Sequence, residues 1–537
     1  MTSFTSHLTA LQSSASRHPS APAFQITTKS GCNGGSVAWV LISYHDFLRD
    51  VDLAAKYWSN TLSAIPTKAV VGMWLAGMDY SDVVHIYGIS RAGYIPQLFS
   101  LRLPNPTVVA ELLERARAQA LIYDRTFESV VHEFPLRVHT ACSLDDMSAF
   151  APAYLPPLQD PVSKEELVFI FHTSGSTSGS PKLVRCNYVW LESMLSKSAQ
   201  ICIPQSPNRQ DVCTWMGSMC HIAQSFMLMG AIQHGSCTIQ PTRIDFSSEE
   251  LADMISRCRL NRLHQFATFL TVHIRHARQN PKLLSVLRSL DTLLYSGLPL
   301  GSEEEEFGYS NSLPLRNLFG STECGAMLIS EGGSDRSARF LRPLNGVHYE
   351  FMPISPPTNA SAHVSANSQL AEMVIMSDSP DCPDMALRQS SDGHFHTGDL
   401  FQEVSPGKYV SRGRNDDWIK SLNSLRCDTR SIEDNVRSTC GDLVQECVVV
   451  GTGRPSPTLF VEPATDMDHE LLKREIVRRT RLFHSRRYLH ERITSVDFIV
   501  VVKQKSLPRT ATKGNIRRQA VEEAYKQELD EIYGVED

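Results

Sequence analysis

The amino-acid sequence predicts an α/β protein, and three observations support this class. From residue 44 to residue 295, apolar segments of strand length alternate with amphipathic segments of helical length, a rhythm typical of βαβ units and parallel sheets. Near residue 413 a turn-rich, charged stretch begins, and two further predicted strands then flank a basic helix. Hydrophobic residues make up 42% and charged residues 20% of the chain, which is ordinary globular usage. We therefore expect a large α/β domain over 1–413 and a small α+β domain over 414–537.

Hydrophobic periodicity places the individual elements. Apolar residues spaced by three and four predict helices, and short apolar runs bounded by turn residues predict buried strands. The predicted helices are 44–58, 82–91, 108–118, 246–257 and the first part of 283–295, whose second part is a strand. The other predicted strands are 69–75, 120–123, 167–171, 263–266, 446–450 and 495–502. A segment rich in Pro, Ser, Ala and Asn, 352–368, predicts a surface loop.

Charge and cysteine usage exclude several classes of function. The formal net charge is −6, so no overall positive field indicates nucleic acid as a partner. The 13 cysteines include no C-x-x-C pair, which argues against a zinc framework and for reduced, mostly buried thiols. The apolar runs are only of strand length, and no apolar segment near Met1 resembles a signal peptide. We therefore expect a cytoplasmic protein without a membrane span.

A loop rich in hydroxyl groups and glycine follows the apolar strand 167–171. Its N–H and O–H groups can surround phosphate oxygens, and a lysine adds a positive charge at its end. The candidate phosphate-binding residues are Thr173, Ser174, Gly175, Ser176, Thr177, Gly179 and Lys182. The loop is not a Walker A motif, because its lysine follows a proline rather than a glycine. Taken alone, it leaves an ordinary Ser/Gly surface loop as the alternative.

Three further motifs follow along the chain. Residues 317–323, Asn-Leu-Phe-Gly-Ser-Thr-Glu, place an aromatic ring, a hydroxyl and a carboxylate at the end of a predicted strand. Residues 396–399, His-Thr-Gly-Asp, offer a turn with a carboxylate, and 409–420 predict a charged turn between the two domains. In this order and at these separations, the four motifs resemble those of the adenylate-forming, or AMP-binding, superfamily. That superfamily includes acyl-CoA and aryl-CoA ligases and fungal NRPS-like adenylation domains.

The resemblance covers nearly the whole chain and implies a two-part architecture. The large N-terminal α/β domain would hold parallel sheets and a small β-subdomain, and the small α+β C-terminal domain would be mobile. Asp416 matches the family's hinge position, and a short polar segment between domains can absorb a change in backbone angles. Because Lys513 lies close to the last residue, Asp537, we expect a single adenylating module whose thiol acceptor comes from outside.

The resemblance also implies which residues contact the nucleotide. The loop after strand 167–171 would order around the β- and γ-phosphates of ATP. Phe319 would stack near adenine, followed by Gly320. Ser296 and Gly297 match the segment of small residues that lies beside adenine and the acyl pocket.

Four more residues would hold the reacting phosphate, the metal and the ribose. Thr322 would contact the α-phosphate, and Glu323 would help to hold Mg²⁺. Asp399 would bind the ribose hydroxyls, and Arg414 would lie near the ribose and phosphate. A carboxylate attacks the α-phosphorus in this chemistry, so both reactants are anionic and the site must supply cations and oriented donors.

The family's catalytic lysine lies near a P-x-T-x-x-G-K segment of the small domain. This chain has Pro-Arg-Thr-Ala-Thr-Lys-Gly at 508–514, so the lysine and the glycine are inverted. Lys513 is the candidate to bridge the acid and the α-phosphate, because the adjacent Gly514 can absorb a shift of one residue. The alternative is a solvated loop lysine in a slow or inactive relative that only binds nucleotide.

The acid pocket is predicted around His221, which resembles the family's histidine-containing segment; the alternative is a core histidine. Amino-acid-activating domains usually have Asp where Ile222 stands, and a buried ammonium without a carboxylate would be costly. We therefore expect an aryl or fatty carboxylic acid rather than an α-amino acid. Leu298, Cys324 and Gly325 would complete the pocket walls.

The thiol acceptor is expected to be CoA or the phosphopantetheine arm of a separate carrier protein. The densest positive patch in the chain lies at 473–492 and could receive CoA phosphates or an acidic carrier. A solvated helix face is the simpler interpretation of this patch.

Replacing Lys513 tests the assignment of the catalytic lysine. We expect Lys513→Ala to lower the rate of adenylation by about a hundredfold, because a displaced catalytic group alone can cost that much. The measurement is pyrophosphate exchange into ATP, with Lys503→Ala and Lys505→Ala as controls. A near-normal rate for Lys513→Ala with a crippled control would contradict the assignment.

Overall fold

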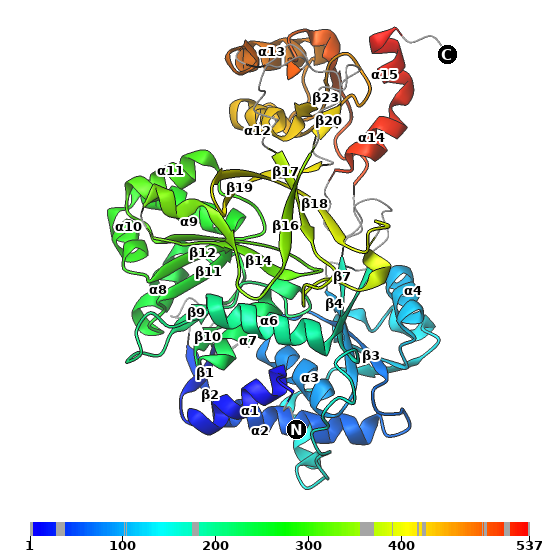
Figure 1. Cartoon of the computed structure of the whole chain (residues 1–537), viewed down its shortest axis with the longest axis vertical. Coiled ribbons are helices and arrows are strands. Elements are labelled where there is room, and N and C mark those ends of the chain that lie inside the picture. The colour runs from blue at the N-terminus through cyan, green and yellow to red at the C-terminus, as the bar shows by residue number, and fades with distance from the viewer. Residues whose placement is uncertain are drawn as a thin grey trace. The chain divides into compact units, whose positions relative to one another are not determined.

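The computed structural model describes most of the chain: residues 4–27, 38–100, 103, 105–173, 182–333, 335–354, 370–388, 390–415, 418–420, 426–485, 487, 491–509 and 516–534. The chain divides into two compact units. Unit 1 consists of 1–173, 181–349 and 375–395, and unit 2 consists of 174–180, 350–374 and 396–537. Figure 1 labels the helices and strands of both units.

A six-stranded sheet in unit 1 has the order β6-β5-β3-β4-β7-β8. The strands are β3 (Val70–Leu75), β4 (Ile95–Ser100), β5 (Ala120–Tyr123), β6 (Arg137–Thr140), β7 (Leu167–Thr173) and β8 (Lys182–Asn187). All neighbours are parallel except β7 and β8, which form an antiparallel hairpin. Every residue of β3 is buried, as expected of a parallel strand covered on both faces.

Helices cover both faces of this sheet. They are α1 (His7–Arg17), α2 (Tyr44–Thr61), α3 (Tyr80–Arg91), α4 (Pro106–Ala116) and the short α5 (Leu144–Met147). Val71 and Met73 of β3 pack in one core cluster with α2 and α3, whereas Val70 and Trp74 pack in another with α4. The alternation follows from the two-residue period of a strand, which points successive side chains to opposite faces.

Unit 1 also contains nine neighbouring strands of a second, larger sheet, in the order β15-β14-β13-β12-β11-β9-β10-β1-β2. These strands are β1 (Pro22–Thr27), β2 (Trp39–Ser43), β9 (Val212–Thr214), β10 (Cys237–Ile239), β11 (Arg262–Phe266), β12 (Thr292–Ser296), β13 (Leu315–Ser321), β14 (Gly325–Ser330) and β15 (Leu341–Pro343). The neighbouring strands β13, β12, β11, β9, β10 and β1 are all parallel to one another. Strands β2, β14 and β15 are antiparallel to their neighbours.

Helices also cover both faces of the second sheet. They are α6 (Tyr188–Ile201), α7 (Ile222–Gln233), α8 (Ser248–Arg257), α9 (Ala267–Gln279), α10 (Pro281–Arg288) and α11 (Ser302–Ser310). Residues of α8, α9 and α10 share a core cluster with Leu263 and Leu293, and Figure 1 shows these helices grouped beside β11 and β12. Residues of α6 and α7 share the other cluster with Leu294 and with β3. Both sheets therefore contribute to the core around α6.

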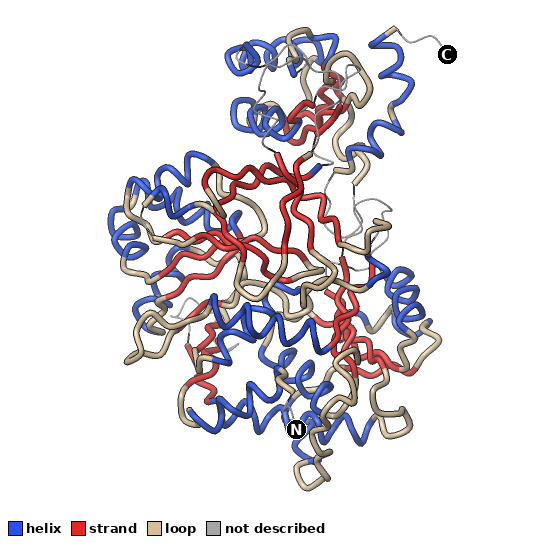
Figure 2. The backbone as a smooth tube through the Cα atoms, viewed as in Figure 1, coloured by secondary structure: helices blue, strands red, loops and turns tan. Residues whose placement is uncertain are grey.

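Unit 2 contains a four-stranded segment, β16-β17-β18-β19, and an α+β part. Its strands are β16 (Tyr349–Pro353), β17 (Leu370–Ile375), β18 (Phe395–Ser405), β19 (Lys408–Arg414), β20 (Trp418–Lys420), β21 (Arg426–Asp428), β22 (Val444–Val450), β23 (Thr458–Pro463) and β24 (Ile499–Val501). Its helices are α12 (Thr429–Cys440), α13 (His469–Ser485), α14 (Arg518–Ala524) and α15 (Lys526–Tyr533). Figure 2 shows how strands and helices intermix in this part.

The predicted fold class is confirmed, and most predicted elements match those of the structure. The helix predicted over 44–58 is α2, and the strand predicted over 120–123 is β5. Two details of the prediction are wrong: residues 396–399 and 409–414 lie within strands β18 and β19 rather than in turns. Among the described residues, no helix is long and apolar enough to cross a membrane. The domain boundary at 413 stays a prediction.

One pH-dependent contact lies in the core of unit 1. His85 is fully buried; the Trp58 indole N–H donates to its Nδ1 at 3.1 Å, and its Nε2–H donates to the Cys142 carbonyl at 2.9 Å. Burial lowers the pKa of His85 from 6.5 to about 4. The imidazole is therefore neutral in the folded protein, and a proton on Nδ1 would face the Trp58 N–H.

We expect the free energy of unfolding to fall as the pH falls from about 6.5 to about 4. Across this range the unfolded chain binds a proton at His85 and the folded protein does not. In His85→Gln the slope should be shallower by up to about 1.4 kcal/mol per pH unit, measured by urea unfolding at a series of pH values. An equal slope in both proteins would contradict the assignment of a neutral, buried His85.

Candidate active site

The turn at 322–324 connects β13 to β14 and carries the predicted α-phosphate and metal residues. Ser321 pairs with Gly325 across the hairpin, and the Cys324 N–H donates to the Ser321 hydroxyl at 3.2 Å. Thr322 and Glu323 are both half-buried residues of this turn. The turn therefore carries a hydroxyl and a carboxylate on consecutive residues.

The backbone of this hairpin is too crowded for larger residues. A Cβ atom on Gly320 would lie 2.4 Å from the Gly325 carbonyl oxygen. Gly325 has a φ of +64°, which disfavours residues with a Cβ. Glycine is therefore required on both sides of the turn, at Gly320 because of crowding and at Gly325 because of its backbone conformation.

Two side chains of helix α6 donate hydrogen bonds to backbone carbonyl groups of the turn. The Trp190 indole N–H donates to the Glu323 carbonyl at 2.9 Å, and the Lys197 ammonium donates to the Cys324 carbonyl at 2.6 Å. Lys197 also forms an ion pair with Asp381 at 2.7 Å. Residues 190 and 197 are two helical turns apart, so they project from one face of α6.

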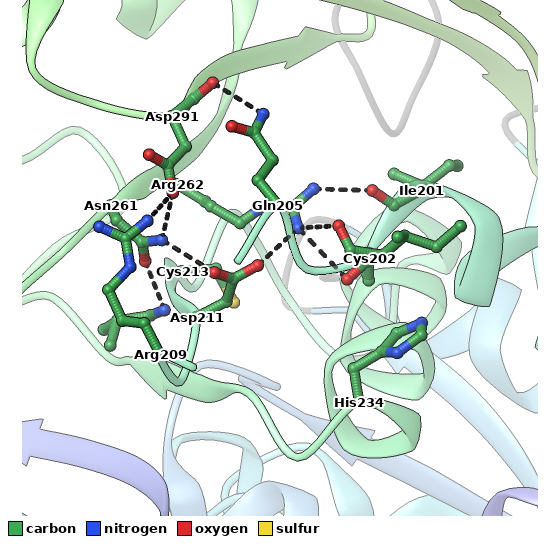
Figure 3. A network of polar contacts seen from close by, with 12 residues as sticks. Ile201, Cys202, Gln205, Arg209, Asp211, Cys213, His234, Asn261, Arg262 and Asp291 are labelled. Carbon is green, nitrogen blue, oxygen red and sulfur yellow. Dashed lines mark hydrogen bonds and ion pairs between the residues drawn. The ribbon is translucent and has the colours of Figure 1, made fainter. Parts of the chain in front are cut away.

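A network of polar contacts fixes the C-terminal end of α6 (Figure 3). The Arg262 guanidinium on β11 donates to the carbonyl groups of Ile201 at 2.7 Å, Cys202 at 3.2 Å and Ile203 at 2.9 Å. It also pairs with Asp211 at 2.8 Å, and both side chains are nearly inaccessible, at 3% and 1% exposure. Arg262 thus satisfies carbonyl groups that the end of a helix leaves without partners.

Asn261 extends this network to the next strand. Its side-chain N–H₂ donates to Asp211 at 2.9 Å and to Asp291 at 2.7 Å, and its side-chain oxygen accepts from the Val212 N–H at 2.6 Å. Arg209 forms an ion pair with Asp291 at the rim (Figure 3). The end of α6 is therefore tied to β9, β11 and the start of β12.

The predicted adenine and acid-pocket residues meet at the carboxyl ends of the parallel strands. Phe266 of β11 pairs with Ser296 of β12, which pairs with Leu318 of β13. Gly297 follows β12 with a φ of +88°, and a Cβ there would lie 3.1 Å from the Phe266 ring. Ligands of α/β proteins bind at such strand ends.

The other predicted pocket residues differ in exposure. The His221 ring lies 6.2 Å from the Phe266 ring in an edge arrangement, and His221 caps α7 by accepting from the Ala223 N–H at 3.3 Å. Leu298 is 52% exposed, whereas Ile222 and Cys324 are buried in the protein interior. Burial raises the pKa of the Cys324 thiol well above its usual value, so this thiol stays protonated.

Thr173, the last residue of β7, and Lys182, the first residue of β8, pair with each other across the β7–β8 hairpin. Ser174, Gly175, Ser176, Thr177 and Gly179 lie between them, outside the described residues. The hairpin itself shows that both ends of the predicted phosphate loop start from one point of the sheet. Asp416 and Lys513 also lie outside the described residues.

The predicted ribose residues form an ion pair within unit 2. Asp399 of β18 and Arg414 of β19 are direct partners across the ladder, with 3.3 Å between Asp399 Oδ1 and Arg414 Nη1. Gly398 has a φ of +72°, and its N–H donates to Glu372 at 2.9 Å. The guanidinium thus holds the orientation of the carboxylate that the sequence assigns to ribose.

The donor set around the turn fits Mg²⁺ better than a metal held entirely by protein. Among the described residues, no group of three or more His, Cys, Asp and Glu side chains could hold a metal ion. Glu323 offers a hard carboxylate oxygen, and the preceding residue, Thr322, offers a hydroxyl. Mg²⁺ is commonly held by one or two carboxylates together with phosphate oxygens and water.

Solved structures show which class of protein has this fold. The o-succinylbenzoate CoA synthetase of Bacillus subtilis, in complex with its acyl-adenylate intermediate, matches with a TM-score of 0.73 at 16% identity, over 96% of this chain and 98% of that one. The A domain of a carboxylic acid reductase from Segniliparus rugosus, in complex with AMP and a carboxylic acid, matches with a TM-score of 0.71 at 14% identity, over 99% and 94% of the two chains. The fold is that of the adenylate-forming enzymes.

Sequence comparison shows the family. The AMP-binding enzyme family matches residues 11–349, and the AMP-binding enzyme C-terminal domain matches residues 416–537. The AMP-binding domain-containing enzyme iboA of Amanita muscaria (strain Koide BX008) is 35% identical over 484 residues, which cover 88% of this chain and 92% of iboA. The adenylate-forming reductase Nps11 of Serpula lacrymans is 22% identical over 83% of this chain and 42% of its own length. The chain belongs to the AMP-binding enzyme family.

Trp190, Lys197 and Asp381 were not predicted from the sequence, although they contact or support the turn. One signal was available for Lys197: it shares a helix face with the apolar residues Trp190, Met194 and Ile201. A charged residue within an apolar stripe indicates a buried partner. The identity of that partner could not be predicted, because Asp381 lies far away in the sequence.

The buried Arg262–Asp211 pair gives a testable stability difference. We expect Arg262→Met to lower the free energy of unfolding by about 3–5 kcal/mol, because it leaves a buried carboxylate without its cation. The matched control is Arg209→Met, which removes a guanidinium that is 52% exposed and should cost about 1 kcal/mol or less. Urea unfolding followed by tryptophan fluorescence measures both; equal losses would contradict the assigned role of Arg262.

Proposed function

We propose that the protein activates a carboxylic acid with ATP and then transfers the acyl group to a thiol. In the first step a carboxylate oxygen bonds to the α-phosphorus, the bond from that phosphorus to the bridging oxygen breaks, and pyrophosphate leaves. The product is an acyl-AMP. Membership of the AMP-binding enzyme family carries this proposal, and the turn with Thr322 and Glu323 agrees with it.

The proposed roles around the turn follow from the chemistry of each side chain. The Thr322 hydroxyl donates to an α-phosphate oxygen. The Glu323 carboxylate would help to hold Mg²⁺, which would neutralise phosphate charge when bound. Phe319 and Gly320 lie beside adenine, with Ser296 and Gly297 on the neighbouring strand end. No protein nucleophile is required, and the buried, protonated Cys324 thiol is unsuited to be one.

The remaining proposed roles belong to residues of other segments. The loop of Ser174, Gly175, Ser176, Thr177 and Gly179, flanked by Thr173 and Lys182, binds the β- and γ-phosphates. Asp399 accepts hydrogen bonds from the ribose hydroxyls, and Arg414 lies beside Asp399. Lys513 bridges the acid and the α-phosphate, and Asp416 is the hinge of a mobile C-terminal domain formed by 414–537.

The proposed acid is an aryl or fatty acid rather than an α-amino acid. Ile222 is buried and apolar, so at this position an α-ammonium would find no carboxylate partner. The exposed Leu298 and the half-buried His221 and Phe266 offer an apolar and aromatic surface at the strand ends. An apolar pocket with few polar groups suits a ring or a chain.

The proposed acceptor is CoA, and the alternative is the phosphopantetheine arm of a separate carrier protein. The relatives and neighbours include both a CoA synthetase and the A domain of a carboxylic acid reductase. The mass of the product after incubation with CoA or with a holo-carrier protein distinguishes the two acceptors.

Pyrophosphate exchange over a panel of acids tests the proposal. We expect labelled pyrophosphate to enter ATP only when an aryl or fatty acid is added. Glu323→Gln should raise the Mg²⁺ concentration needed for half-maximal exchange by at least about 10-fold, because replacing even a residue that only supports a metal ligand typically costs about 10–100-fold in metal affinity. The matched control is the exposed Glu303→Gln, which should leave the Mg²⁺ requirement unchanged. Exchange that is absent for every acid would leave a protein that only binds nucleotide, and would contradict the proposal.

A further inference from the structure

The ion pair between Lys197 and Asp381 is the most deeply buried charge pair described in unit 1. Their side chains are 1% and 0% exposed, and 2.7 Å separates Lys197 Nζ from Asp381 Oδ2. The Ser379 hydroxyl donates to the other carboxylate oxygen at 2.6 Å, and the Tyr349 hydroxyl donates to Oδ2. The His348 N–H donates to Ser379 at 2.9 Å. The carboxylate is thus held by partners on both oxygens.

A buried ion pair often adds little to the free energy of unfolding. Removing two charges from water costs more than their attraction returns in many proteins, and apolar residues of similar volume are often as stable. On the same face of α6 as Lys197, the apolar residues Met194 and Ile201 are buried in the core cluster. A methionine would fit that environment, so the charge needs another explanation.

The position of the ammonium provides that explanation. Lys197 Nζ donates to the Cys324 carbonyl at 2.6 Å, one residue after Glu323, whose own carbonyl accepts from the Trp190 indole. Two donors on one helix face therefore hold two successive peptide groups of the turn. Met194 lies between them, and its sulfur fills the space next to Gly325.

Both ends of this connection are fixed. At one end the Arg262 network ties the last carbonyl groups of α6 to the sheet. At the other, Asp381 and its partners fix the ammonium. A donor fixed in this way sets the orientation of the peptide that it binds, because a charge-assisted hydrogen bond is short and directional.

We propose that Lys197 and Asp381, together with Trp190, are positioning residues that orient the 322–324 turn so that Glu323 and Thr322 face the metal and the α-phosphate. This inference rests on the proposed function. It assigns no contact between Lys197 or Asp381 and the substrate. The buried pair therefore contributes to Mg²⁺-dependent nucleotide binding as well as to folding.

The test separates positioning from stability with three variants. Lys197→Met removes the donor and leaves Asp381 as an unpaired buried charge. Lys197→Met/Asp381→Asn removes both charges, so most of the lost stability should return, while the Cys324 carbonyl still lacks its donor. Trp190→Phe removes the indole N–H together with part of the ring system and keeps an aromatic ring. Trp58→Phe is its matched control, because it makes the same change at a buried indole that donates to His85 instead.

The readouts are the melting temperature and the affinity for ATP with and without Mg²⁺, measured by calorimetry without any acid. We expect Mg²⁺ to increase the ATP affinity of the wild-type protein and of Trp58→Phe. In Lys197→Met and in the double variant this Mg²⁺-dependent gain should fall at least tenfold. Trp190→Phe should lose part of the gain, whereas Trp58→Phe, with a comparable loss of buried ring volume and of melting temperature, should keep it.

The outcomes distinguish this inference from the proposed function. If the double variant regains both its melting temperature and the full Mg²⁺-dependent gain, the pair is only structural and the inference is overturned. The same conclusion follows if Trp190→Phe and Trp58→Phe behave alike. If the wild-type protein instead shows neither Mg²⁺-dependent ATP binding nor acid-dependent exchange, the proposed function is what fails.

Discussion

Two buried ion pairs fix helix α6, and the turn that carries Thr322 and Glu323 depends on the position of this helix. Arg262 and Asp211 hold its C-terminal end, and Lys197 and Asp381 connect its middle to the Cys324 carbonyl. Buried charges tolerate little displacement, because each must keep its partner at hydrogen-bond distance or bear the cost of desolvation. The pairs therefore constrain the turn more strongly than apolar packing would, since apolar side chains can repack with small shifts.

The parallel sheets supply the second constraint. In a parallel sheet the carboxyl ends of neighbouring strands lie at one edge, so segments that follow different strands are brought together. The register of β11, β12 and β13 places Phe266, Ser296 and Leu318 in one row. The residues that follow, Gly297 and Phe319, extend from that row, and α6 and α7 pack into the core that both sheets of unit 1 share. The strand ends at Phe266, Ser296 and Leu318 lie far apart in the sequence and are brought together for this reason.

Much of the fold, and the family, could be predicted from sequence because the signals are local, whereas the roles of the site residues stay predictions. An apolar run such as 120–123 defines a strand, and the order of the motifs identifies the family. The turn predicted at 396–399 was wrong because Gly398 adopts a positive φ within strand β18, and glycine in a strand resembles glycine in a turn. Lys197 and Asp381 could not be paired, because their contact depends on the packing of α6 against a segment nearly two hundred residues later. The assigned roles of Lys513, Asp416 and the phosphate loop stay predictions, as these residues lie outside the described ranges.

The central claim is that one oxygen of the acid becomes bonded to the α-phosphorus of ATP, and oxygen labelling tests it most directly. With the accepted acid labelled by ¹⁸O in both carboxylate oxygens, acyl-AMP formation joins one labelled oxygen to phosphorus, and transfer of the acyl group to a thiol leaves that oxygen on AMP. Mass spectrometry of the products should therefore find one ¹⁸O atom in AMP and none in pyrophosphate. Unlabelled AMP, or label in inorganic phosphate or pyrophosphate, would contradict the account.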